Sequence, residues 1–128
     1  MLVRLFRKSE EKAAREAAAQ AEIDRLRGLS IEELAVTVLP GLQPEGTGPE
    51  RYLRTQQLCE YLLRDFPGIG HTRPLQLMAR VGRALVKLEE AGLASSLSLE
   101  RSPRWCITTA GASALTEGTA ERRLAVPS

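Results

Sequence analysis

Hydrophobic and polar residues alternate along most of the chain with the period of an α-helix. Apolar residues recur three and four positions apart, and glycine, proline or N-capping residues interrupt the pattern where a helix would begin or end. These signals predict helices over about 9–27, 30–39, 55–66, 74–91 and 108–118.

Several of the predicted helix ends carry residues with specific capping chemistry. Ser30 followed by Glu33 is a capping box, in which each side chain accepts a hydrogen bond from the backbone N–H of the other residue. Thr55 and Thr108 are suitable N-caps for the third and the last helix. Gly92 is suited to the cap that closes the fourth helix.

The period changes from helix to strand after the fourth helix. Residues 93–99 alternate leucine with serine and alanine, and residues 104–108 return with Trp105 and Ile107 on one face. A turn over 100–103 joins the two runs, so a short hairpin is expected. The predicted fold class is therefore mainly α with a small β-hairpin, an α+β arrangement.

The length of 128 residues allows one compact domain with an additional element. We expect a helical extension over 1–28, a domain over 29–118 and a flexible tail over 119–128. Glycine and proline are frequent in 41–50, which predicts a loop. The extension has a weak, alanine-rich apolar stripe. It fits a helix that is solvated or packed on its own domain, and it also fits a dimerising helix.

The fourth predicted helix has one apolar and one cationic face. Its cationic face collects Gln76, Arg80, Arg83 and Lys87, and no acidic residue lies between Gly68 and Leu88. Arginine can pair with guanine or bind phosphate, and glutamine can reach adenine, so this face suits the major groove of DNA. The same face is also compatible with simple solvation. Gly82 leaves open whether 74–91 is one helix or two.

The segments LVKLEEAGL (85–93) and WCITTAG (105–111) resemble the end of the winged helix-turn-helix domain in bacterial regulators of the MarR-like and PadR-like groups. The resemblance in architecture covers about 30–117. It implies a transcriptional regulator whose basic helix enters the major groove, with Arg101 and Arg104 on the wing. It also implies a homodimer that binds double-stranded DNA at paired half-sites.

A protein-interaction module with the same fold and no nucleic-acid partner is the alternative, because folds do not fix functions. The net charge of +2 does not decide between the two.

Other functional classes find little support in the residue types present. No nucleotide-binding or hydrolase motif is found, so we expect neither an enzyme nor a cofactor. Cys59, Cys106 and the single histidine, His71, do not form a zinc pattern, and both cysteines are expected in the core. The apolar runs are too short to span a membrane, and a cytoplasmic location is expected.

Overall fold

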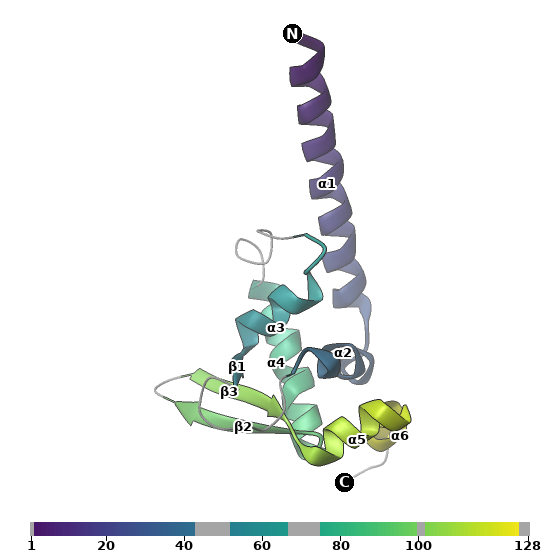
Figure 1. The fold of residues 1–128 in the computed structure, drawn as a ribbon, viewed down its shortest axis with the longest axis vertical. Helices are drawn as coiled ribbons and strands as arrows, with labels where there is room; N and C mark the ends of the chain where they lie inside the picture. The colour runs from purple at the N-terminus through teal and green to yellow at the C-terminus, as the bar shows by residue number, and fades with distance from the viewer. Residues whose placement is uncertain (1, 43–51, 67–74, 100–101, 126–128) are drawn as a thin grey trace.

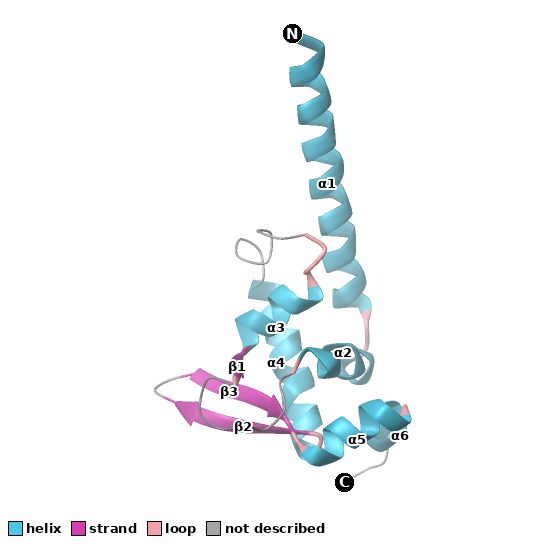
Figure 2. Ribbon diagram, viewed as in Figure 1, coloured by secondary structure: helices cyan, strands magenta, loops and turns pink. Residues whose placement is uncertain are grey.

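The computed structural model describes residues 2–42, 52–66, 75–99 and 102–125, and their side chains over 9–42, 52–66, 77–97 and 103–125. A small sheet lies at one side of a group of helices, and one long helix extends away from them (Figures 1 and 2). The elements are α1 (Leu2–Gly28), α2 (Ile31–Val38), the 3-10 turn η1 (Leu39–Gly41), β1 (Leu53–Arg54), α3 (Thr55–Leu62), α4 (Leu75–Glu90), β2 (Ala94–Leu99), β3 (Ser102–Ile107), α5 (Thr109–Glu117) and α6 (Ala120–Ala125).

The sheet contains the expected hairpin and one additional strand. Its three strands are antiparallel in the order β1-β3-β2. Trp105 of β3 pairs with Leu53 of β1 and with Ser96 of β2, whereas Arg104 pairs with Arg54 and Leu97. Because directly paired residues share a face, Trp105 lies on one face and the arginines on the other. The short β1 was not predicted.

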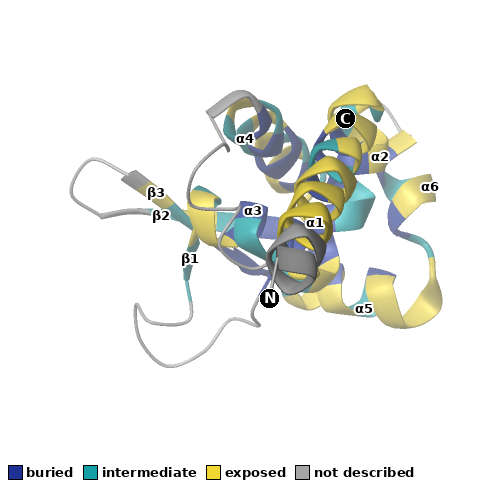
Figure 3. Ribbon diagram, turned by 90° about the horizontal axis from the view of Figure 1, so that it is seen from above, coloured by how far each residue is buried: buried dark blue, intermediate teal, exposed yellow. Residues whose placement is uncertain are grey.

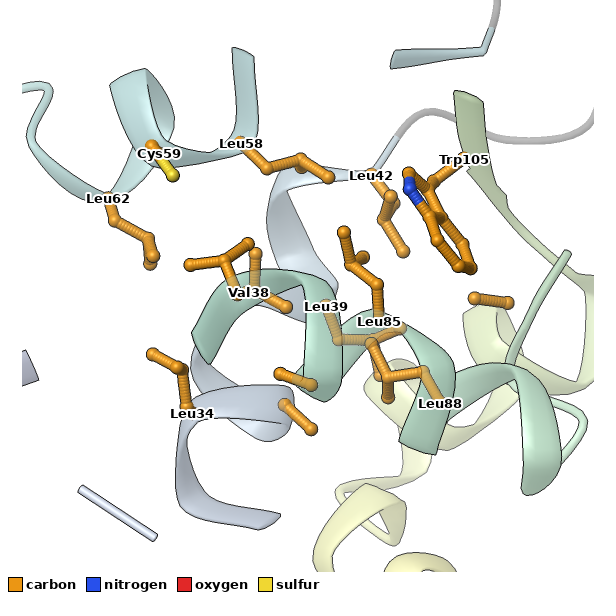
Figure 4. Close-up of a cluster of buried hydrophobic side chains, with 14 of the residues drawn as sticks. Leu34, Val38, Leu39, Leu42, Leu58, Cys59, Leu62, Leu85, Leu88 and Trp105 are labelled. Carbon is orange, nitrogen blue, oxygen red and sulfur yellow. The ribbon is translucent and has the colours of Figure 1, made fainter. Parts of the chain in front are cut away.

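The core lies between α2, α3, α4 and the Trp105 face of the sheet. α2 packs along α4, and α3 crosses the same helix. Figure 4 shows the Trp105 ring projecting from β3 toward Leu42, among leucines from several elements. Leu34, Leu58, Leu85 and Leu88 are completely buried. Burying each such side chain contributes about 1.5–3 kcal/mol, so these leucines hold the helices on the sheet.

α1 is longer than the sequence pattern indicated. It begins at Leu2, not near residue 9, and its 27 residues extend about 40 Å. Only Ala19, Ile23 and Leu26 are buried among the described side chains of this helix, while residues 9–18 are all exposed (Figure 3). The C-terminal third of α1 therefore anchors it to the domain.

Most of the predicted capping residues occupy the expected positions. The Ser30 N–H donates to Glu33 Oε1, and the Glu33 N–H donates to Ser30 Oγ; each donor–acceptor distance is 3.1 Å. Thr108 Oγ1 accepts from the Gly111 N–H at 3.0 Å and begins α5. Gly92 adopts a φ of 78°, in the left-handed region that a glycine favours after a helix.

The third predicted helix differs at both ends. Its N-cap is Arg54, whose backbone N–H donates to Gln57 Oε1 at 2.8 Å, so Thr55 is the first helical residue and the expected Thr55 cap is wrong. The α-helix ends at Leu62, and the chain continues in a turn toward Phe66.

α4 is one uninterrupted helix through Gly82, so residues 74–91 contain one helix and not two.

The prediction of a flexible tail over 119–128 is wrong in part, because α6 forms there. Ala120 and Leu124 are buried, and α6 packs against α2. Apart from Gly41 and Leu42, the loop expected over 41–50 lies outside the described residues. Within the described ranges, no helix combines the length and the hydropathy that a membrane span requires.

Candidate functional site

The outer face of α4 borders an open groove of about 490 Å³. One wall is the exposed stripe of this helix, which is mainly small or charged. Thr55 at the start of α3 and Pro103 and Trp105 of β3 form the rest of the lining. We call this feature the α4 groove. Its α4 residues are Ala79, Gly82, Arg83, Val86, Lys87 and Glu90.

The periodicity of α4 places this stripe opposite the core. Leu77, Val81, Leu85 and Leu88 recur at helical spacing and are completely buried. The residues between them consequently face outward along one side of the helix. The hairpin follows directly after α4 and lies beside it, which gives the groove its second wall.

Arg83 is one of two cationic residues that line the α4 groove. Its side chain is exposed, and within the described part of the chain it has neither a hydrogen-bond nor an ion-pair partner. A planar guanidinium in this state keeps all of its donors available for a carboxylate, a phosphate or a guanine edge.

Arg80, predicted on the same cationic face, is placed differently. Its side chain is half-buried, and Nη2 donates to the backbone carbonyl of Leu29, between α1 and α2. Arg80 Nε is buried without a partner among the described atoms. Arg80 does not line the α4 groove and acts as a link between helices.

Lys87 lines the groove but is not fully free. Its Nζ lies 3.8 Å from Glu32 Oε1 of α2, and both side chains are partly exposed. Such pairs contribute little, about 0–1 kcal/mol, so an incoming anion would displace Glu32 at low cost.

Acidic residues near this face fall into two groups. Glu90 lines the groove with Arg83 and Lys87, so the positive charge there is partly offset. Glu89 points elsewhere, because its carboxylate accepts hydrogen bonds from the backbone N–H and the hydroxyl of Ser96 in β2.

Two further arginines lie together on the outer face of the sheet. Arg104 is half-buried and pairs in register with the exposed Arg54 of β1. Like charges directly opposite each other are unfavourable, and an anion would relieve their repulsion. Sequence reasoning missed Arg54 because β1 has only two residues and no detectable alternation.

The structure does not describe the side chains of two predicted site residues. Arg101 lies outside the described residues, and for Gln76 only the backbone, within α4, is described. The residues that the structure brings together are therefore Arg83 and Lys87 in the groove, and Arg54 and Arg104 on the sheet.

Besides Arg80 Nε, two buried side-chain atoms lack a hydrogen-bond partner among the described atoms, Trp105 Nε1 and Thr119 Oγ1. Both cysteines are buried free thiols, and desolvation raises the pKa of Cys59 to about 12. No group of three or more metal-ligating side chains occurs in the described ranges.

The sequence matches no protein-family model, and neither a curated protein nor a solved structure matches the chain.

Proposed function

We propose that the chain is a winged-helix protein that binds double-stranded DNA through the outer face of α4 and regulates transcription. The observation that carries this proposal is the guanidinium of Arg83, which has no partner among the described residues and lies on the exposed face of a helix that leads directly into the hairpin. The chain order of three helices (α2, α3 and α4), the β2–β3 hairpin and α5 supports the proposal, because the resemblance to winged-helix regulators implies that order.

The dimensions of α4 suit the major groove. The helix has 16 residues, and a groove about 12 Å wide admits an α-helix. Ala79 is small, and a Cβ placed on Gly82 would have no atom within 4 Å apart from its chain neighbours and the backbone of its own helix. The helix axis can therefore approach the base edges closely, with Arg83 projecting from the middle of the stripe.

Arg54 and Arg104 supply a second positive element. In this proposal they bind the phosphate backbone beside the groove that α4 enters, which positions the protein without reading sequence. The proposed DNA-bound form is a homodimer on paired half-sites, as in the regulators that the sequence resembles.

The test is fluorescence anisotropy with mixed-sequence duplex DNA at about 50 and 200 mM salt. Arg83→Ala and the double variant Arg54→Ala/Arg104→Ala should each weaken binding, and each lost phosphate contact should reduce the salt slope by about 1. Arg122→Ala, an exposed arginine of α6, is the matched control and should leave binding unchanged. Absence of binding at the lower salt concentration would overturn the proposal.

A second candidate is a protein-interaction module. It is favoured by Glu90 within the groove and by Val86, which is 44% exposed. An apolar residue flanked by both signs of charge suits a protein surface. If no DNA is bound, Val86→Glu should abolish an interaction with a purified protein partner, and Leu115→Glu on α5 should not.

A further inference from the structure

Val86 is an apolar residue on the exposed face of α4. It is 44% exposed, and Leu115 of α5, at 36%, is the other large hydrophobic residue in this state among the described side chains. Val86 belongs to the lining of the α4 groove, whereas Leu115 does not. The apolar side chain therefore stands free on the same stripe as the unpartnered Arg83, one helical turn further along.

We infer that Val86 recognises the 5-methyl group of a pyrimidine in the major groove, next to a guanine bound by Arg83. This inference rests on the proposed function of α4. An isopropyl group has no hydrogen-bonding atom, so the apolar feature of a base edge is the one it can select. In the major groove that feature is the C5 methyl of thymine, and 5-methylcytosine carries the same group.

The spacing along α4 supports contact with neighbouring base pairs. Val86 lies three positions after Arg83, which corresponds to about 4.5 Å along the helix axis. Successive base pairs are about 3.4 Å apart. Because the two distances are similar and arginine is long, the two side chains can reach adjacent base pairs.

The small residues of the stripe make this short-range contact possible. A valine side chain reaches only a short distance from the backbone, so α4 must lie deep in the major groove of the DNA. Ala79 and Gly82 present little or no side chain, and the space around Gly82 is open. Ala79, Gly82 and Val86 line the same groove, so the valine has small neighbours on the helix surface.

The experiment starts from duplexes enriched by the wild-type protein from a randomised pool. One enriched duplex is resynthesised with uracil in place of each thymine in turn, and separately with 5-methylcytosine in place of each cytosine. Removing the recognised methyl group should weaken binding about fourfold, the equivalent of about 0.8 kcal/mol. If the recognised base is 5-methylcytosine, replacing cytosine by 5-methylcytosine at that position should strengthen binding by a similar factor.

Two variants decide whether Val86 is responsible. Val86→Ala should bind the methylated and unmethylated duplexes equally, whereas Leu115→Ala should retain the full difference. Circular dichroism checks that both variants remain folded.

The possible failures are distinguishable. If no duplex is enriched, the proposed function and this inference are both overturned. If DNA binds and no single methyl group changes the affinity, or if Val86→Ala keeps the methyl dependence, only the role of Val86 is overturned.

Discussion

The guanidinium of Arg80 donates a hydrogen bond from Nη2 to the backbone carbonyl of Leu29. This contact joins the middle of α4 to the short connection between α1 and α2. The Leu29 N–H donates in turn to the Leu26 carbonyl at a distance of 3.3 Å, and Leu26 is completely buried. Arg80 thus contributes to the attachment of the projecting helix.

Replacing Arg80 should therefore affect stability more than replacing Arg83. Arg80→Ala leaves the Leu29 carbonyl without its charged donor, which should lower the free energy of unfolding by about 1–3 kcal/mol. Arg83→Ala removes an exposed side chain with no partner among the described residues, so a change within about 0.5 kcal/mol is expected. Urea unfolding measures both. Equal effects of the two variants would contradict a linking role for Arg80.

The capping box of α2 predicts a specific pH dependence. The hydrogen bonds from the Ser30 backbone and hydroxyl lower the pKa of Glu33 in the folded protein. A carboxyl whose pKa is depressed on folding stabilises the protein above its unfolded pKa of about 4.3, and this contribution is lost as the pH falls through the lower folded pKa. Glu33→Gln keeps an acceptor oxygen but cannot ionise.

The stability difference between the wild type and Glu33→Gln should accordingly be constant near neutral pH and narrow below about pH 5. Urea unfolding at a series of pH values measures it, and other titrating groups cancel in the comparison. A difference that stays constant down to about pH 3 would show that ionised Glu33 has no special role.

The elements that sequence reasoning identified correctly are those whose signal is local. The Ser30 cap, the Thr108 cap and the Gly92 turn each depend on chemistry within a few residues, so they are visible without tertiary information. β1 was missed because its two residues become a strand only by pairing with β3, which lies far away in the sequence.

The roles of the charged residues also depend on tertiary contacts that the sequence pattern does not show. The helical period places Arg80 and Arg83 on one polar side of α4, and the sequence alone gives them the same role. Their surroundings differ because the Leu29 carbonyl approaches the helix at Arg80 and not at Arg83. The pairing of Arg54 with Arg104 likewise depends on sheet register, which no pattern within either segment encodes.

Cys59 should be chemically inert in the folded protein. Burial, with a smaller contribution from Glu60, raises its pKa to about 12. Very little of this thiol would be ionised at pH 8, and the thiolate is the reactive form. Ellman's reagent should therefore react with neither Cys59 nor the buried Cys106 under native conditions and with both in urea. Rapid native labelling that disappears in Cys59→Ser would contradict this burial.

Two glycine substitutions should change stability in opposite directions. A Cβ on Gly111 would collide with the backbone carbonyl oxygen of Leu93 and lie 2.7 Å from Ile107 Cγ1. Because a backbone carbonyl cannot move without disturbing β2, Gly111→Ala should destabilise the protein by about 1–3 kcal/mol. Gly82 lies inside α4 with nothing within 4 Å of the added Cβ, so Gly82→Ala should stabilise it by about 0.5–1 kcal/mol. If both variants raised the urea midpoint, helix propensity and not the approach of α5 to Leu93 would determine the response, and a lower midpoint for Gly82→Ala would contradict its predicted stabilisation.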